Sequence, residues 1–289
     1  HNKDKYEVYG FDYGYQKKDK THFRIKEYFD NFFYVADMND NQIADLSRRH
    51  DIDIAIHRNG HSQNSRSNIF SYRAAPLQLS FLGYPGTTGL DFIDYILADK
   101  IVIPNENIKC FSEKIIFMPD TYYPTFNERK ISTSIVTRNT LGISKDSLVL
   151  CCFNNSYKIS PEEFDIWARI INKLNNCYLI LLVENDEIKK NLQQEANKRN
   201  VDIKKIKFLN YINNQEHLGR HSIGDIYLDT FNYNGHTSIV DSLYSGLPVI
   251  TKIGKSFSSR VGASLLNSFN MKNLITTDAK QYENLIFEL

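Results

Sequence analysis

The chain has 289 residues, enough to bury the core of one large or two medium-sized α/β domains. Hydrophobic residues make up 42% and charged residues 24% of the chain, which excludes a disordered or fibrous protein. The 35 basic and 34 acidic side chains leave a formal charge of +1. Because so small a charge creates no overall field, neither nucleic acid nor an anionic membrane is an expected partner.

The cysteines and the ends of the chain bear on its location and extent. Cys110, Cys151, Cys152 and Cys177 lack CxxC spacing and predict free thiols in a reducing compartment. No apolar run is long enough to span a bilayer and no signal peptide is recognisable, so we expect a cytoplasmic protein. The chain begins at His1 without a methionine and stops inside a helical pattern, so we expect it to be incomplete at both ends.

Short apolar runs typical of strands alternate with helical patterns along the chain. In the first part they are Tyr6–Asp12, Asp53–His57, Leu77–Leu82, Tyr95–Ala98 and Lys114–Met118, and in the second Leu148–Phe153, Cys177–Val183, Ile206–Leu209, Ile223–Asp229 and Pro248–Thr251. Strands that are apolar on both faces and separated by helices predict parallel sheets covered on both sides. We therefore predict an α/β fold with two such sheets.

The polar, aperiodic segment Pro119–Thr140 predicts a linker between two lobes, which we place at residues 1–130 and 131–289. The clearest helix of the second lobe is Pro161–Leu174. Ser160 is expected to cap it in a Ser-x-x-Glu capping box with Glu163, and Pro161 suits its first turn.

The end of the predicted strand Leu148–Phe153 offers a candidate catalytic residue. Ligands of open α/β sheets bind at the carboxyl ends of the strands, and Lys158 lies three to five residues past the end of this strand. An ammonium group there would stabilise the charge that develops on a departing diphosphate. An ordinary surface lysine remains the alternative interpretation.

A second candidate follows the strand Ile223–Asp229. Gly235 precedes His236, Thr237 and Ser238, which open the helical stretch up to Gly246. First-turn amides and the helix dipole favour negative charge, so this turn predicts a site for phosphate oxygens. The predicted ligand is a nucleotide or another phosphate compound.

Three further groups complete the candidate site. In the first lobe, Leu82-Gly-Tyr-Pro-Gly-Thr-Thr-Gly89 is a turn whose glycines would let the backbone approach a ligand, or it is a generic turn. His217 and Arg220 lie one helical turn apart and can face a base or a phosphate, unless they belong to a solvated helix. Asp241 can accept hydrogen bonds from a ribose diol, or it merely stabilises the helix dipole.

Other chemistries find little support in the sequence. The histidines lack the paired spacing of zinc sites, and no acidic pair recommends itself for Mg²⁺, so we expect neither a metal nor a cofactor. The GxGxxG and Walker-type lysine motifs are missing from the sequence, which argues against dehydrogenases and NTPases.

Six motifs occur in an order that matches one family. They are Leu82–Gly89, Asp94-Tyr-Ile96 with Asp99, Ser112-Glu-Lys114 with Met118-Pro119, Phe153–Ile159, Asp229-Thr230 with Asn234–Ser238, and Ser259-Arg-Val261. In these motifs the chain resembles the catalytic region of the O-linked N-acetylglucosamine (O-GlcNAc) transferases, a family that includes the plant SPINDLY proteins.

The resemblance implies a GT-B fold of two Rossmann-like lobes with a cleft between them and a metal-independent, inverting transfer to protein Ser or Thr hydroxyls. The donor would be UDP-GlcNAc, and a tetratricopeptide-repeat (TPR) domain would precede the chain. Lys158 is similar to the family lysine at the diphosphate. The other donor-binding residues implied by the resemblance are Gly83, Tyr84, Pro85, Asn155, Ile212, Asn214, His217, Arg220, His236, Thr237, Ser238 and Asp241.

Departures from the family pattern leave alternatives open. Asn155 replaces a glutamine and looks more like SPINDLY, which uses GDP-fucose, whereas Gly86 and His236 look more like GlcNAc transferases. His57-Arg58 also departs from the usual residues, and the family's N-terminal Asp and His-Pro motif is missing. We predict a UDP-GlcNAc:protein O-GlcNAc transferase. The alternatives are a transferase that uses GDP-fucose or UDP-glucose, and an inactive nucleotide-binding fragment, and we expect the 289 residues alone to be weakly active or inactive.

Overall fold

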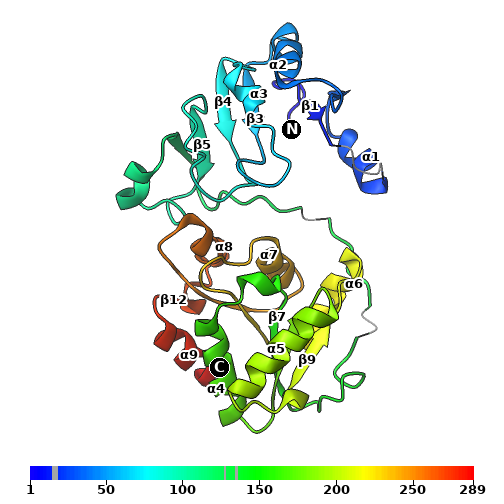
Figure 1. Ribbon diagram of the computed structural model, residues 1–289, viewed down its shortest axis with the longest axis vertical. Helices are drawn as coiled ribbons and strands as arrows, with labels where there is room; N and C mark the ends of the chain where they lie inside the picture. Colours follow the sequence, from blue (N-terminus) through cyan, green and yellow to red (C-terminus); the bar gives the residue numbers. More distant parts are fainter. Residues whose placement is uncertain (15–18, 127, 134–135) are drawn as a thin grey trace. The chain divides into compact units, whose positions relative to one another are not determined.

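A computed structural model of the protein describes residues 1–14, 19–126, 128–133 and 136–289. They form two compact units, drawn in Figure 1. The first unit comprises His1–Tyr84, Thr88–Ile96 and Ser112–Lys114, and the second comprises Pro85–Thr87, Leu97–Phe111 and Ile115–Leu289. Each unit is built around parallel strands.

The second unit contains a parallel six-stranded sheet in the order β12-β11-β10-β7-β8-β9. Renumbered within the unit, this is the 3-2-1-4-5-6 order of nucleotide-binding sheets, read from β9 to β12. The switch point therefore lies between β7 and β10. The strands are β7 Leu148–Cys152, β8 Cys177–Leu182, β9 Ile206–Leu209, β10 Ile226–Leu228, β11 Val249–Lys252 and β12 Ile275–Thr276.

The central strands of this sheet are buried on both faces. Four successive residues of β7, from Val149 to Cys152, are fully buried, as are all three residues of β10. Helices therefore cover both sides, as the apolar runs predict. The helices of the second unit are α4 Pro161–Lys173, α5 Asp186–Lys198, α6 Asn214–Gly219, α7 Thr237–Tyr244, α8 Val261–Ser268 and α9 Ala279–Glu288.

Helix α4 shows why these residues fold as they do. The Glu163 carboxylate accepts hydrogen bonds from both the N–H, at 2.8 Å, and the hydroxyl of Ser160, and Pro161 occupies the first turn. This confirms the predicted capping box. The apolar face of α4 includes Trp167, which is 0% exposed and donates to the hydroxyl of Tyr282 on α9.

The first unit holds a parallel pair, β1 Tyr9–Asp12 with β2 Asn31–Tyr34, and the order β3-β4-β5-β6 in a second sheet. Those strands are β3 Ile54–His57, β4 Leu77–Ser80, β5 Tyr95–Ala98 and β6 Lys114–Phe117, and the division between units passes through β5 and β6. The helices are α1 Lys20–Lys26, α2 Asp40–Arg49 and α3 Asn68–Ser71. The core of the first unit contains Val35, Ile43, Ala44, Ile69, Phe70, Ala74 and Ile93.

Each strand predicted from the sequence overlaps an observed strand, whereas β2 and β12 were not predicted. The segment predicted as a linker has no helix or strand in its described residues, and these belong to the second unit. Cys151, Cys152 and Cys177 are buried free thiols, and Cys110 is an exposed one. Over the described part of the chain, no helix combines the length and apolar character that crossing a membrane requires.

Candidate functional site

Two segments with predicted site residues leave the sheet of the second unit at its switch point. Phe153–Lys158 follows β7, and Asp229–His236 connects β10 to α7. The two strands are hydrogen-bonded neighbours, with Ile226 opposite Leu150. Their carboxyl ends therefore deliver Lys158 and the His236 turn to one edge of the sheet, where ligands bind in this class of fold.

A buried carboxylate holds the turn between β10 and α7. Asp229 is 0% exposed and accepts hydrogen bonds from the backbone N–H of Thr230, at 2.9 Å, and of Gly235, at 2.6 Å. The Thr251 hydroxyl donates to its other oxygen at 2.6 Å. Burial raises the pKa of Asp229 to about 7, while these donors act in the opposite direction. The Asp229 carboxylate thus holds the turn at both ends, through the backbone N–H groups of Thr230 and Gly235.

Asn154 connects the two segments. Its amide nitrogen donates to Asp229 Oδ1 at 3.2 Å and to Thr230 Oγ1 at 2.9 Å, and its oxygen accepts from the Ser238 hydroxyl. A Cβ atom at Gly235 would lie 2.8 Å from this amide oxygen, so a glycine is required there. Asn154, which is 2% exposed, therefore braces the loop after β7 against the start of α7.

Lys158 ends a 3-10 helix, Ser156–Lys158, and points to the same turn. Its ammonium donates to the Asn234 carbonyl at 3.2 Å and lies 4.2 Å from the centroid of the Tyr233 ring. Burial lowers the pKa of Lys158, and the Asp229 charge raises it. The carboxylate that shapes the turn thereby also favours the charged form of the lysine.

The start of α7 presents the other predicted phosphate contacts. Thr237 and Ser238 are its first residues, and the N–H groups of a first helical turn have no partner within the helix. The His236 ring stacks on Tyr233, with ring centroids 4.9 Å apart. Burial, and then Lys158, lower the pKa of His236 to about 3, so the imidazole is neutral. Its Nε2 atom is buried and has no hydrogen-bond partner among the described residues.

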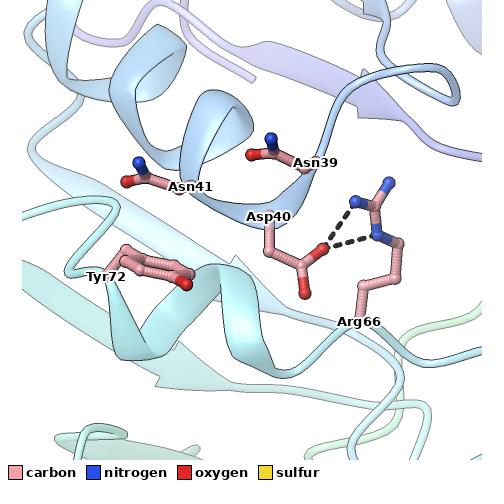
Figure 2. A pocket seen from close by; sticks show the side chains of 5 residues that line it. All are labelled: Asn39, Asp40, Asn41, Arg66 and Tyr72. Atoms are coloured by element: carbon pink, nitrogen blue, oxygen red, sulfur yellow. Dashed lines mark hydrogen bonds and ion pairs between the residues drawn. The ribbon is translucent and has the colours of Figure 1, made fainter.

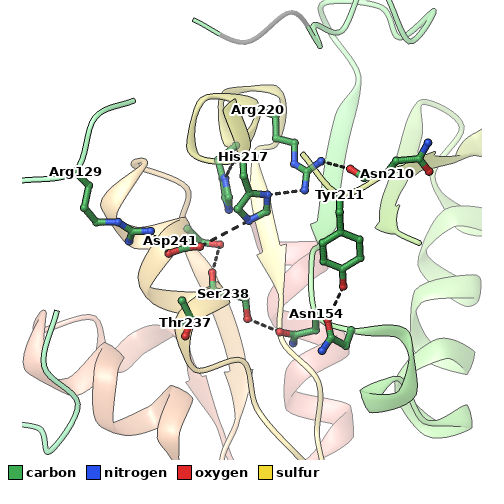
Figure 3. A network of polar contacts seen from close by, with 12 residues as sticks. Arg129, Asn154, Asn210, Tyr211, His217, Arg220, Thr237, Ser238 and Asp241 are labelled. Atoms are coloured by element: carbon green, nitrogen blue, oxygen red, sulfur yellow. Dashed lines mark hydrogen bonds and ion pairs between the residues drawn. The ribbon is translucent and has the colours of Figure 1, made fainter. Parts of the chain in front are cut away.

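A second polar network surrounds Asp241 (Figure 3). Arg129 Nη2 donates to Asp241 Oδ1 at 2.6 Å, and His217 Nε2 lies 3.7 Å from Asp241 Oδ2. Arg220 donates to His217 Nδ1 and to the Asn210 carbonyl. Burial, and then Arg220, lower the pKa of His217 to about 3. The neutral imidazole accepts at Nδ1 and therefore turns an N–H toward Asp241.

Asn155 takes part in an exposed chain of polar contacts next to the Lys158 loop. The Tyr211 hydroxyl donates to its amide oxygen at 2.5 Å, and its amide nitrogen donates to the Tyr157 hydroxyl at 3.1 Å. Ile212 and Asn214 follow Tyr211, and both are exposed to solvent. The predicted contact residues of the second unit thus gather around one sheet edge.

The predicted loop Leu82–Gly89 is divided between the units: Pro85–Thr87 belong to the second unit, and Gly83 and Tyr84 are closely packed within the first. A Cβ atom on Gly83 would collide with the Arg58 carbonyl, and Tyr84 meets the His61 ring edge-on at 5.3 Å. Gly83 is therefore needed for packing within the unit. Contacts of Gly83, Tyr84 and Pro85 to a donor sugar stay predictions.

The first unit also has a polar surface hollow that the sequence did not indicate (Figure 2). Asp40, Asn39, Asn41 and Tyr72 line it together with Arg66, whose Nε donates to Asp40 at 2.7 Å. Across residues 1–14, 19–126, 128–133 and 136–289, no three His, Cys, Asp or Glu side chains gather as a metal-ligand set.

The match to a protein family extends over the whole chain. Residues 1–129 and 123–289 match the model of glycosyl transferase family 41. The chain belongs to glycosyl transferase family 41. The predicted relationship to the O-GlcNAc transferases and SPINDLY is thereby confirmed.

Two relatives of this family 41 chain come from Arabidopsis thaliana, and both are named probable UDP-N-acetylglucosamine--peptide N-acetylglucosaminyltransferases. SEC is 31% identical over 98% of the chain, and SPINDLY is 29% identical over 88% of it. The chain spans 30% of the length of SEC and 28% of SPINDLY.

A solved structure supports the fold of the family 41 chain. The Thermobaculum terrenum O-GlcNAc transferase mutant K341M matches all of this chain and 54% of its own, with a TM-score of 0.91 and 24% identity. The predicted α/β fold class of the GT-B type is confirmed by this match.

Sequence reasoning missed the residues that hold the site together. Asn154 carries no signal of its own beside Asn155 and Lys158 in the same motif, and Asp229 is predicted only as the end of the strand Ile223–Asp229. The sequence does offer a signal for Asp229, which directly follows an apolar run. A carboxylate at the end of a buried strand is itself buried unless the chain leaves the sheet before it. Arg129 had no signal, because 112 residues separate it from Asp241.

Proposed function

We propose that this family 41 chain forms the catalytic region of a transferase that moves N-acetylglucosamine from UDP-GlcNAc to Ser or Thr hydroxyls of a protein. The observation that carries the proposal is the convergence of the Lys158 ammonium and the first turn of α7 at the sheet's switch point. The names of the SEC and SPINDLY relatives support UDP-GlcNAc as donor and a peptide as acceptor.

The proposed reaction is an inverting displacement. The acceptor hydroxyl oxygen attacks the anomeric carbon from the face opposite the diphosphate and releases its proton to the solvent, the bond from that carbon to the phosphate oxygen breaks, and UDP leaves with its negative charge. Lys158 and the N–H groups of Thr237 and Ser238 stabilise this charge without a metal ion. His236, which is neutral at physiological pH, is assigned to the phosphates.

The remaining contacts hold the nucleotide. Asp241 accepts hydrogen bonds from the ribose hydroxyls, and His217 and Arg220 lie on the side of the base. Ile212 and Asn214 contact the uracil, Asn155 lies beside the diphosphate, and Gly83, Tyr84 and Pro85 are assigned to the sugar. We propose that a TPR domain elsewhere in the full-length protein recruits the acceptor.

Replacing Lys158 by alanine tests the proposal. In the full-length protein, transfer from radiolabelled UDP-GlcNAc should fall by a factor of about 10² to 10³, as expected when a charge-stabilising donor is removed. The affinity for UDP, measured by calorimetry, should change by less than about tenfold, because binding also uses the α7 amides and Asp241.

Lys207→Ala is a matched control. Lys207 also carries its ammonium over an aromatic ring, 5.5 Å from the centroid of Tyr178, but the two residues lie in the amino-terminal halves of β9 and β8, away from the carboxyl ends of the strands. Its replacement should leave transfer unchanged. Normal transfer by the Lys158→Ala variant would refute the proposed role.

A second candidate function changes the donor to GDP-fucose or UDP-glucose. Asn155, in place of glutamine, favours the first of these, and its amide is held by Tyr211 and Tyr157. Calorimetric titration with the three nucleotide sugars separates the candidates. Tight binding of GDP-fucose alone would contradict the UDP-GlcNAc assignment, and binding of UDP-GlcNAc without transfer by the full-length protein would indicate an inactive nucleotide-binding module.

A further inference from the structure

Arg129 is fixed on α7 although it lies in a segment without regular structure. Its guanidinium bonds Asp241 Oδ1 at 2.6 Å, with only 13% of the Arg129 and 6% of the Asp241 side chain exposed. The Tyr244 hydroxyl accepts from the Arg129 N–H at 3.0 Å and donates to the Arg129 carbonyl at 2.9 Å. The Tyr244 ring also faces the guanidinium at 5.3 Å. These four contacts together hold the positive charge of Arg129 next to Asp241.

The two oxygens of Asp241 are in different situations. Oδ1 is bonded to Arg129, whereas the nearest ion-pair partner of Oδ2, His217 Nε2, lies 3.7 Å away, too far for a hydrogen bond. The other charged or titratable groups on that side are Arg220, which bonds His217, and His221, whose ring centroid is 4.8 Å from that of His217. Oδ2 is thus an acceptor that the bond to Arg129 does not use.

A buried ion pair gains little stability over apolar packing, because both charges lose their hydration. A buried Arg129–Asp241 pair is therefore better explained if the carboxylate also binds a ligand. We propose that Arg129 is a positioning residue of the nucleotide site, which holds the Asp241 carboxylate in place for the ribose hydroxyls of a nucleoside diphosphate. The inference rests on the proposed function, since it assumes that Asp241 meets a ribose.

Arg129 acts on Asp241 in two ways. The bond to Oδ1 fixes the carboxylate so that Oδ2 faces the ligand. Burial raises the pKa of Asp241 and the Arg129 guanidinium lowers it, so Arg129 also favours the ionised form. An ionised carboxylate only accepts hydrogen bonds, which is what a ribose diol requires.

The test measures coupling between Arg129 and the ribose hydroxyls. UDP and 2′,3′-dideoxy-UDP are titrated by calorimetry into the wild-type protein and the Arg129→Gln variant. The wild type should prefer UDP by about 10- to 100-fold, the range expected for hydrogen bonds to a charged acceptor. In Arg129→Gln the preference should shrink to less than about threefold, and Arg129→Lys should restore part of it.

Tyr244→Phe is the matched control, because it removes both hydrogen bonds to the Arg129 backbone and keeps the guanidinium. This variant should retain most of the preference for UDP. Full retention in Arg129→Gln, or equal loss in Tyr244→Phe, would show that Arg129 merely anchors its segment and would overturn the inference. A wild-type protein that does not bind UDP at all would instead contradict the proposed function.

Discussion

Replacing His221 by asparagine should weaken the acid sensitivity of the second unit. His221 is 1% exposed, and its Nδ1–H donates to the His217 carbonyl at 2.8 Å. Its Nε2 is buried without a hydrogen-bond partner among the described residues. Protonation would place a second N–H at this position, and burial therefore lowers the pKa of His221 to about 4. Asparagine can keep the donor to His217 and does not titrate.

The size of the effect follows from the difference between the folded and unfolded pKa. The ordinary histidine pKa is about 6.5, so below this pH the unfolded chain binds a proton that folded His221 refuses until about pH 4. Stability is therefore present above pH 6.5 and is lost as the pH falls toward 4. When the pH falls from 7.5 to 5.5, protonation linked to His221 alone should lower the free energy of unfolding by about 1.3 kcal/mol. The lowered pKa values of His217 and His236 also reduce the free energy of unfolding on acidification, whereas the raised pKa of Asp229 has the opposite effect.

The assay is urea unfolding at both pH values, followed by the fluorescence of Trp167. This is the single tryptophan of the chain and is fully buried in the second unit, so it reports the unit that contains His221. The loss of unfolding free energy on acidification should be about 1.3 kcal/mol smaller in His221→Asn than in the wild type. The exposed His50, which belongs to the first unit, provides the control His50→Asn. Equal acid sensitivity of the wild type and His221→Asn would refute the reasoning.

Two further predictions concern α4 and metal ions. Ser160→Ala removes the capping box of α4 and should lower the free energy of unfolding, followed by Trp167 fluorescence, by about 0.5–2 kcal/mol. Replacement of the exposed Ser144 by alanine is the control and should have a far smaller effect. Equal changes in the two variants would contradict the capping argument. Excess EDTA should leave transfer by the full-length protein unchanged, because Lys158 and the α7 amides are proposed to carry the charge stabilisation; loss of transfer restored by Mg²⁺ would show that a metal takes part.

Much of the fold follows from local patterns, because the strands of a covered parallel sheet have no polar face. Leu148–Cys152 and Cys177–Leu182 are apolar throughout, and their prediction succeeded for this reason. The two-residue strand Ile275–Thr276 has no periodicity to detect. Asn31–Tyr34 has an apolar run, but its residues are only partly buried in a two-stranded sheet.

The candidate site was predictable where chemistry lies on consecutive residues. Lys158 and His236–Ser238 belong to the segments that follow β7 and β10, and the sheet order brings these two strands together. The residues that brace the site are harder to predict. Asn154 is recognisable only from its contacts, and the position of Asp229 after an apolar run indicates burial but not its hydrogen-bond partners. Arg129 depends on the path of a segment without regular structure, which no local pattern specifies.

The half-buried Asn155 offers a practical route to altering the proposed donor selectivity. Among the described residues, its amide is held by the hydroxyls of Tyr211 and Tyr157, which are 50% and 76% exposed, whereas the neighbouring turn relies on the buried Asn154 and Asp229. Mutant libraries restricted to positions 155, 157 and 211 would therefore sample new sugar preferences while keeping the scaffold folded. Laboratory evolution of the proposed transferase can begin with these three codons.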